Sequence, residues 1–281
     1  AVYSGLISGD TFTGSYTGAF SNANVGTGKT VTITSSYTGA DVSNYSVTDQ
    51  SSTTANITAK SLTVSGITAS SKTYDGSVTA TMNGNSAVYS GLVSGDTFTG
   101  SFSGVFANAN VGTGKTVNIT SSYSGADVNN YSVTDQSTTT ANITAKALTA
   151  TATASNKVYN SSSAATVTLS LSGFIGSETV TSTNSSTFNN KNAGTGKTVT
   201  VNTITLADGS NGGLAANYSI STGQTTTANI TAKSLTVSGI TASNKTYDST
   251  TSATLGTGAV IYGGKVSGDD FTGSYLSLIH I

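Results

Sequence analysis

The stretch TFTGSFSGVF, Thr97–Phe106, alternates between two kinds of side chain. Its Phe and Gly residues share one face of an extended chain, and its Thr and Ser residues share the other. The spacing of the Phe residues would also suit a helix, but the Gly residues and the run of Thr and Ser disfavour one. A period of two is typical of a half-buried β-strand, so this stretch predicts a strand whose Phe side chains face a core.

The same pattern recurs along the 281-residue chain. Residues 1–60 and 87–146 differ at only nine of 60 positions, and apolar positions stay apolar. Three motifs recur in the same order: GTGKTV from Gly26, Gly112 and Gly194, NYS from Asn44, Asn130 and Asn217, and TANITAK from Thr54, Thr140 and Thr227. A disordered low-complexity tract has no core to maintain, so these repeats indicate duplicated folded units.

The repeat length divides the chain into four segments, numbered here repeats 1 to 4. Residues 1–60 correspond to the C-terminal part of repeat 1, 61–146 and 147–233 to the complete repeats 2 and 3, and 234–275 to the N-terminal part of repeat 4. We therefore expect the chain to be a fragment of a longer array. The last six residues, Leu276–Ile281, break the pattern and resemble translated adapter sequence, so we interpret them as foreign.

Turn signals recur about every 8 to 12 residues, and no stretch carries a helical stripe. This predicts an all-β fold of tandem small β-sandwiches, immunoglobulin-like in architecture, with β-grasp-like modules as the alternative. Between repeats 1 and 2, Ile57 and Ala59 lie on odd positions, whereas Leu62 and Val64 lie on even ones. The inward face therefore changes at Lys60–Ser61. One strand is expected to leave a domain and enter the next almost without a linker, which predicts stiff joints and a rod.

The motif KTYDG at Lys72–Gly76 has near-copies, KVYNS from Lys157 and KTYDS from Lys245. The residue after Tyr always carries a side-chain oxygen, which can accept a backbone N–H in an Asx-turn. General acid–base chemistry requires an ionisable carboxylate, which Asn160 lacks. Ser at the last position of two copies argues against a strict need for a positive φ there. A structural corner with Tyr packed beside it is preferred over a ligand site; its residues are Tyr74, Asp75, Gly76, Tyr159, Asn160, Ser161, Tyr247, Asp248 and Ser249.

Five motifs in order, LTVSGITASSKTYDG, SGDTFTG, NVGTGKTV, NYSV and TANITAK, together resemble the bacterial YDG repeat domain, which is named after this tripeptide. The resemblance covers the chain to Tyr275. The first corner matches the family signature, whereas the second and third, YNS and YDS, depart from it. The resemblance implies extracellular β-rich modules in tandem within large surface or secreted exoproteins, including adhesins similar to filamentous haemagglutinin and autotransporters. It implies no particular ligand.

Composition excludes several classes of function. Eleven Lys and Arg against 12 Asp and Glu give a net charge of −1, so there is no basic footprint for nucleic acid or anionic lipid. No run approaches the roughly 18 apolar residues of a membrane span, so no membrane insertion is expected. The absence of Cys excludes disulfide and thiol chemistry. The single His, His280, lies in the suspect tail, and Glu178 is the single Glu. We therefore expect no enzyme, no catalytic residues and no cofactor.

Further motifs invite functional interpretations. GTGKT lacks the first Gly of a P-loop and precedes strand-like sequence, so Lys29, Lys115 and Lys197 are expected on a hairpin or strand edge. Asn56 and Asn142 open N-x-T triplets that are compatible with glycosylation. Six residues could supply oxygen ligands for Ca²⁺, but they lack EF-hand spacing and are expected to be solvated turn residues: Asp10, Asp41, Asp49, Asp96, Asp127 and Asp135.

These observations predict a non-catalytic stalk or spacer segment of a large bacterial adhesin, located at the cell surface or secreted. Its expected partners are neighbouring repeats of the same chain. A module that binds glycans or host ligands by multivalency is one alternative, because Tyr89, Tyr123 and Tyr131 could stack on sugars, although core packing is preferred for them. Accessory repeats of a secreted enzyme, with the catalytic domain outside these residues, are the other alternative.

Overall fold

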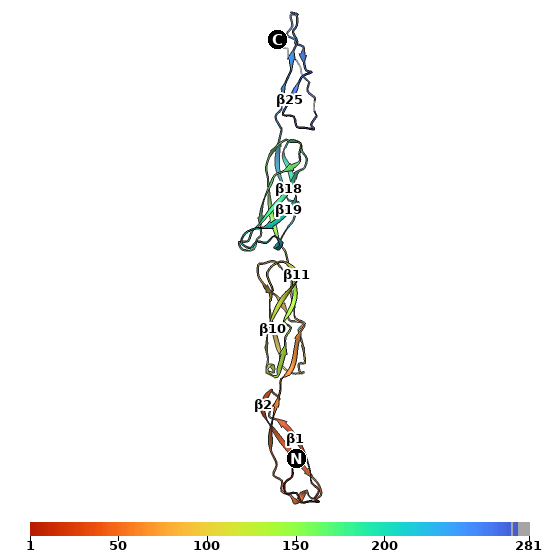
Figure 1. The fold of residues 1–281 in the computed structure, drawn as a ribbon, viewed down its shortest axis with the longest axis vertical. Coiled ribbons are helices and arrows are strands. Elements are labelled where there is room, and N and C mark those ends of the chain that lie inside the picture. Colours follow the sequence, from red (N-terminus) through yellow and green to blue (C-terminus); the bar gives the residue numbers. More distant parts are fainter. Residues whose placement is uncertain (271, 275–281) are drawn as a thin grey trace. The chain divides into compact units, whose positions relative to one another are not determined.

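The computed structural model describes residues 1–270 and 272–274. The interpretation of Leu276–Ile281 as foreign, and the only His, therefore lie outside the described residues. The chain divides into two compact units, and Figure 1 shows that its regular elements are mainly strands. The first comprises Ala1–Lys72 with Ser77–Ile143, and the second comprises Thr73–Gly76 with the residues from Thr144 onward.

The first unit contains repeat 1 and most of repeat 2. Repeat 1 forms one antiparallel sheet in the order β1–β2–β3, with the 3-10 helix η1 between β2 and β3. Repeat 2 forms a five-stranded sheet β6–β13–β11–β10–β7, a three-stranded sheet β12–β4–β9 and the pair β5–β8. The elements are β1 (Thr13–Phe20), β2 (Gly26–Thr38), η1 (Val42–Asn44), β3 (Ser52–Ile57), β4 (Lys60–Ser65), β5 (Thr68–Ala69), β6 (Lys72–Thr73), β7 (Thr79–Ala80), β8 (Met82–Asn83), β9 (Val88–Ser90), β10 (Thr99–Phe106), β11 (Gly112–Ser124), η2 (Val128–Asn130), β12 (Tyr131–Thr134) and β13 (Thr138–Thr144).

The second unit contains repeat 3, which repeats this plan, and repeat 4. Repeat 3 forms a five-stranded sheet β15–β21–β19–β18–β16 and a three-stranded sheet β17–β14–β20, and repeat 4 forms the pairs β22–β25 and β23–β24. The elements are β14 (Lys146–Ala154), β15 (Lys157–Val158), β16 (Ala164–Ala165), β17 (Val167–Ser172), β18 (Val180–Phe188), β19 (Gly194–Asp208), η3 (Ala215–Asn217), β20 (Tyr218–Ile220), β21 (Thr225–Thr231), β22 (Thr236–Ser238), β23 (Thr241–Ala242), β24 (Leu255–Gly256) and β25 (Ile261–Gly263).

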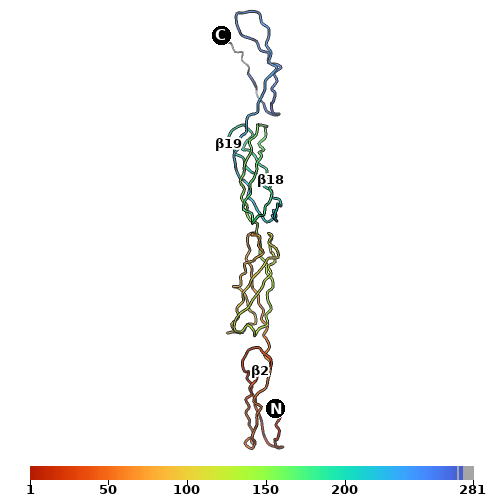
Figure 2. Tube along the Cα trace, turned by 90° about the vertical axis from the view of Figure 1, so that its left-hand side faces the viewer, coloured from red at the N-terminus to blue at the C-terminus, as the bar shows by residue number. Residues whose placement is uncertain are grey.

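The strand predicted from Thr97–Phe106 is present as β10, and the all-β prediction is confirmed. β10 pairs with β11 so that Phe106 lies opposite Val117, and Phe106 is only 2% exposed. In repeat 3 the corresponding strands β18 and β19 run side by side (Figures 1 and 2), with Phe188 opposite Val199. The period-two pattern thus sets the same hairpin in both complete repeats.

Each complete repeat buries its core between two sheets. In repeat 3, β17 of the three-stranded sheet packs its buried side chain with those of the five-stranded sheet, in the cluster Val167, Phe188, Val199, Val201, Ala228 and Ile230. In repeat 2, one cluster joins Leu62 of β4 and Tyr131 of β12 to Phe98, just before β10. This is a sandwich arrangement. A β-grasp requires a helix across a sheet, whereas the helical elements of the described residues are three-residue 3-10 helices.

Repeat 1 exposes a face that repeat 2 buries. Phe20 of β1 is 42% exposed, although its counterpart is the buried Phe106. Among the described residues, repeat 1 forms the single sheet β1–β2–β3, whereas repeat 2 also has the sheet that contains β4, whose Leu62 and Val64 are buried. A cavity of about 830 Å³ lies on the uncovered side of the repeat 1 sheet. The Phe position that is buried in repeat 2 is thus exposed in repeat 1.

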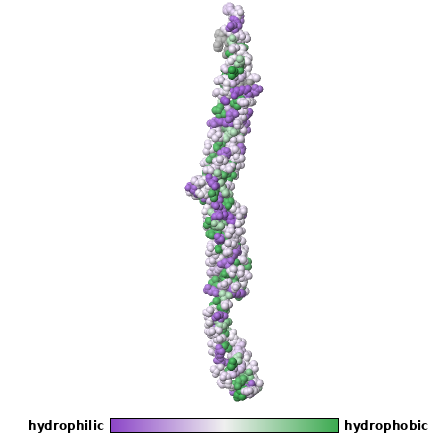
Figure 3. All heavy atoms as spheres, in the orientation of Figure 1, coloured by the Kyte–Doolittle hydropathy of each residue, from purple (hydrophilic) through white to green (hydrophobic). Residues whose placement is uncertain are grey.

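The surface reflects the Ser-, Thr- and Gly-rich composition. Figure 3 shows a surface of mostly intermediate hydropathy over which strongly hydrophilic side chains are scattered. Within the described part of the chain, no helix has the length and apolar character needed to cross a membrane.

Candidate functional site

The Lys that opens each motif closes the corner that follows it. In repeat 2, Lys72 Nζ donates to the carbonyl oxygens of Ser77 at 2.7 Å and Thr79 at 3.1 Å. The same ammonium lies 5.5 Å from the ring centre of Phe106, a cation–π geometry. One side chain therefore closes the turn and covers the edge of the core.

Repeat 3 reproduces this arrangement. Lys157 Nζ donates to the carbonyl oxygens of Ser162 at 2.6 Å and Ala164 at 2.8 Å, and it lies 5.4 Å from the ring centre of Phe188. Burial lowers the pKa of the Lys157 ammonium, because desolvation disfavours its charged form. The Lys is therefore a built-in part of the corner and not a free surface charge.

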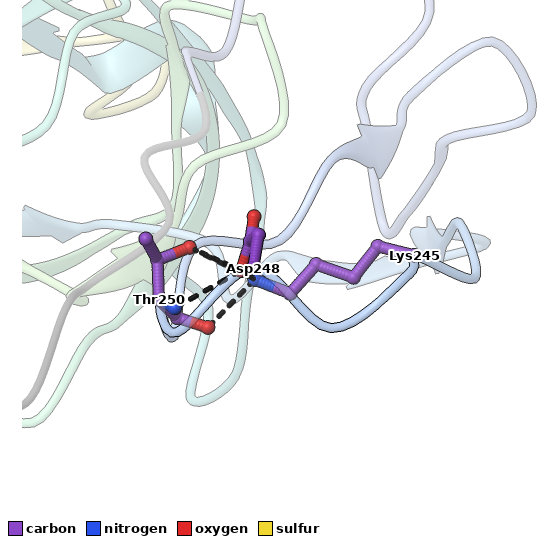
Figure 4. Close-up of polar contacts among 3 residues, drawn as sticks. All are labelled: Lys245, Asp248 and Thr250. Atoms are coloured by element: carbon purple, nitrogen blue, oxygen red, sulfur yellow. Dashed lines mark hydrogen bonds and ion pairs between the residues drawn. The ribbon is translucent and has the colours of Figure 1, made fainter.

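The residue after Tyr forms an Asx-turn in repeats 3 and 4. Asn160 Oδ1 accepts the N–H of Ser162 at 3.2 Å, and Asp248 Oδ1 accepts the N–H of Thr250 at 2.9 Å. Asp248 also pairs with Lys245 at 2.9 Å (Figure 4), and this contact is the main cause that holds the pKa of its carboxyl below the usual range. An amide and a carboxylate thus make the same turn, which requires only an acceptor oxygen.

The last motif position has a positive φ in all three copies, 75° at Gly76, 64° at Ser161 and 60° at Ser249. The expectation that Ser argues against such a conformation is therefore wrong. A residue with a Cβ bears a cost of about 1–2 kcal/mol in this region. In repeats 3 and 4 the Asx-turn and the Lys bonds hold the chain on both sides of the Ser, which offsets that cost.

The Tyr of the first corner contacts repeat 3. It belongs to the second unit, where Tyr74 is 5% exposed and its backbone N–H donates to Thr144 O at 2.8 Å. Tyr74 Oη donates to Glu178 Oε1 at 2.7 Å, and Tyr218 Oη donates to Glu178 Oε2 at 2.7 Å. The two rings meet edge to face with centroids 5.6 Å apart. One carboxylate therefore binds two phenols, one from each repeat.

Both phenols stay protonated in the physiological range. Desolvation, reinforced by the hydrogen bond to Glu178, raises the pKa of Tyr74 to about 12. The pKa of Tyr218 is raised by desolvation and by the same carboxylate. A neutral phenol beside a carboxylate can donate a hydrogen bond but cannot act as a base, so this arrangement supports binding and not acid–base chemistry.

The second corner makes a similar contact with repeat 4. Tyr159 Oη donates to Asp269 Oδ1 at 2.7 Å, and both residues line a cavity of about 560 Å³. The third corner tyrosine, Tyr247, is 89% exposed. Two of the three corner tyrosines therefore bind an acidic residue of the repeat that follows.

The GTGKT segment forms a β-bulge, at which the pairing of β11 with β13 shifts between Gly112 and Lys115. Gly114, with φ 59°, donates its N–H to Asn142 Oδ1 at 2.7 Å, and Lys115 Nζ donates to Asn108 Oδ1 at 2.6 Å. β11 lies between β10 and β13, so Lys115 lies at the β10–β11 hairpin, the first of the two expected places, and not on a strand edge. The equivalent pairs in repeats 1 and 3 are Lys29 with Asn22, and Lys197 with Asn190.

The six Asp residues considered as Ca²⁺ ligands accept hydrogen bonds from nearby side chains and turns. The donors are Tyr45 to Asp10, Thr11 to Asp41, Tyr37 to Asp49, Tyr131 to Asp96, Thr97 to Asp127 and Tyr123 to Asp135. Among the described residues, no three His, Cys, Asp or Glu side chains gather as a metal site would need.

The tyrosines considered for sugar stacking surround one core ring. Tyr89, Tyr123 and Tyr131 have ring centroids 5.6, 5.0 and 5.7 Å from that of Phe98. Tyr131 is buried and the other two are half-buried. These three rings therefore pack against the core of repeat 2 itself.

Sequence reasoning missed the roles of Lys72 and Glu178. A signal for the Lys was present, because Lys stands two residues before Tyr in every corner. The signal for Glu178 was weak, because its loop reads GSE where the other repeats read SGD. Only the acidic character of the last loop residue is shared.

No curated protein and no solved structure matches the chain. The family model of the YDG domain matches residues 1–55, 58–141 and 144–228, which is most of the chain. Its three matches follow one another along the sequence with two residues between them. The chain therefore belongs to the YDG domain family and carries this domain three times in tandem.

Proposed function

We propose that the chain is a non-catalytic spacer segment of a large bacterial surface or secreted protein of the adhesin class. The observation that supports this most is the close succession of domains. β13 ends at Thr144 and β14 begins at Lys146, so a single residue separates the last strand of repeat 2 from the first long strand of repeat 3. A chain of domains without linkers suits a spacer, whose task is to set a distance.

The corner and loop chemistry supports the same proposal. The corner residues bind their own turn or an acidic residue of the following repeat. A glycan-binding module would need exposed aromatic faces, whereas Tyr89, Tyr123 and Tyr131 pack around Phe98. These contacts favour the spacer over the glycan-binding alternative.

The decisive experiment is a long sequencing read through the gene on both sides of this segment. We expect a secretion signal together with an anchor, a β-barrel or a partner transporter, and a separate binding domain. A hydrolase or lyase domain next to the repeats would instead favour accessory repeats of a secreted enzyme. A screen of the chain against glycans tests the remaining alternative, and binding at millimolar glycan would contradict a pure spacer.

The rod expected from the sequence is tested separately by small-angle X-ray scattering. We expect the maximum dimension to grow in equal steps as whole repeats are added. A maximum dimension that stays nearly constant on addition of a repeat would contradict the spacer proposal, because such domains would not set a distance.

A further inference from the structure

The acidic residues that receive the corner tyrosines occupy one position in a shared turn. In each repeat the backbone N–H of the acidic residue donates to the carbonyl oxygen three residues earlier. The four bonds are Asp10 to Ile7 at 3.2 Å, Asp96 to Val93 at 3.2 Å, Glu178 to Ile175 at 3.0 Å and Asp269 to Val266 at 3.2 Å. The turn persists in repeat 3, although the loop sequence there has diverged, so an acidic side chain is presented in the same way each time.

One oxygen of this carboxylate is used inside its own repeat. Tyr45 donates to Asp10 Oδ2, Tyr131 to Asp96 Oδ2 and Tyr218 to Glu178 Oε2. The hydroxyl of this tyrosine also accepts a backbone N–H from the turn, as Ile175 donates to Tyr218 Oη at 3.0 Å. The tyrosine and the turn therefore hold the carboxylate in a fixed orientation.

The other oxygen is used between repeats. Glu178 Oε1 accepts the hydroxyl of Tyr74 at 2.7 Å, and Asp269 Oδ1 accepts that of Tyr159 at 2.7 Å. At the first of these contacts, the last corner residue also approaches the turn, because a Cβ on Gly76 would lie 3.0 Å from Ile175 Cγ2. The corner thus packs against the turn that presents the carboxylate.

We infer that the YDG tyrosine is a recognition residue for the next repeat, and that the acidic residue of the SGD-type turn is its receptor. The partner of each corner is therefore another YDG domain, recognised by a carboxylate that its own tyrosine holds in place. The inference goes beyond the proposed spacer function and does not depend on it, because the contact would hold in any array of these domains.

A packing role alone would not require a hydroxyl. Phe in place of Tyr74 would keep the edge-to-face contact with Tyr218 but would leave Glu178 Oε1 without this donor. A hydrogen bond to a charged group contributes more than one between neutral groups, so the half-buried Glu178 carboxylate should be sensitive to the loss of this donor. The hydroxyl and the carboxylate should therefore behave as one coupled pair, and this distinguishes recognition from simple burial.

The test is native-state hydrogen exchange of the full chain, measured by NMR at single amides. The reporters are the amide of Tyr74, bonded to Thr144 O, and the amide of Ile175, bonded to Tyr218 Oη. Tyr74→Phe and Glu178→Gln are each expected to speed exchange of both reporters by about ten- to a hundredfold. The double variant should be affected less than the two single effects combined, because Tyr74→Phe removes the donor of a bond whose acceptor Glu178→Gln weakens.

Tyr247→Phe is the matched control, because the same motif carries an exposed hydroxyl there, and it should change neither reporter. Glu178→Asp should keep more protection than Glu178→Gln, since Asp serves as receptor in repeat 4. Additive effects of Tyr74→Phe and Glu178→Gln, or an unchanged Ile175 amide in Tyr74→Phe, would overturn the inference. If Glu178→Gln unfolds repeat 3, Tyr159→Phe replaces it with the Asp269 amide as reporter, and unchanged exchange there would also overturn it.

Discussion

At the scale of single residues, the corner tyrosines show that folding and recognition are separate tasks. Tyr74 is 5% exposed and bound to Glu178, whereas Tyr247 is 89% exposed in a corner with the same Lys. The corner of repeat 4 is closed by Lys245 and Asp248 without help from its tyrosine. The turn is therefore locally determined, and the tyrosine remains available for a contact outside it.

The Tyr74 contact should be sensitive to alkaline pH. Its pKa is raised to about 12 by desolvation and by the Glu178 carboxylate, whereas an unfolded Tyr titrates near 10. The stabilisation is therefore fully present below about pH 10 and is lost as pH rises towards 12. We expect ¹³Cζ NMR to show Tyr74 titrating above pH 11, and Glu178→Gln to lower that value. A titration near pH 10 in the unmodified chain would contradict the burial and pairing described.

Gly76 should tolerate Ala less well than Gly223, a glycine of the second unit that also has a positive φ. It has φ 75°, and a Cβ would meet Ile175 Cγ2 at 3.0 Å. Gly223 in the same unit has φ 91° but nothing within 4 Å of its Cβ position. Gly76→Ala should lower the free energy of opening at the Tyr74 amide by about 2 kcal/mol, from backbone strain and crowding. Gly223→Ala should leave that amide unchanged, and equal effects would rule out a tight corner contact.

At the scale of single elements, the bulge in β11 depends on one side chain. Asn142 of β13 accepts the N–H of Gly114 at 2.7 Å. Asn142→Ala should destabilise the first unit by about 1 kcal/mol, the usual net value of such a bond. The matched control is Asn118→Thr on β11, because repeat 1 has Thr32 at this position. Denaturant unfolding compares the two, and an equal midpoint shift in both variants would count against the role of the bulge.

The elements differ in how far the sequence could predict them. The alternation of Phe and Gly with Thr and Ser was sufficient to predict β10, because one face of this strand meets the core and the other meets solvent. The parallel pairing of β4 with β12, which sets Leu62 beside Val133, joins segments far apart in the sequence, and no local pattern encodes it. The Asx-turn could be anticipated from Asn160, since its chemistry is local, whereas the positive φ of Ser161 depends on bonds from Lys157 that only the folded corner reveals.

At the scale of the whole molecule, near-identical sequences occupy unequal surroundings. Repeat 1 and the second part of repeat 2 form the same hairpin with the same register, but among the described residues repeat 2 adds a second sheet, β12–β4–β9. Stability in tandem repeats is approximately a sum of local terms. The contribution of a residue to the free energy of unfolding should therefore depend on whether a second sheet buries it, and not on its neighbours in the sequence. Two equivalent positions in this chain allow the comparison.

Phe20 and Phe106 provide that comparison. Both lie opposite a Val in the same register, but Phe20 is 42% exposed and Phe106 is 2% exposed. Phe106→Ala should cost about 3–5 kcal/mol, because it leaves a cavity between two sheets. Phe20→Ala should cost less than half as much, since water already reaches the ring. Hydrogen exchange measures the two losses of stability separately. The β11 amides report on Phe106→Ala, and the β2 amides report on Phe20→Ala. Equal losses would contradict the exposure of Phe20 on the sheet of repeat 1.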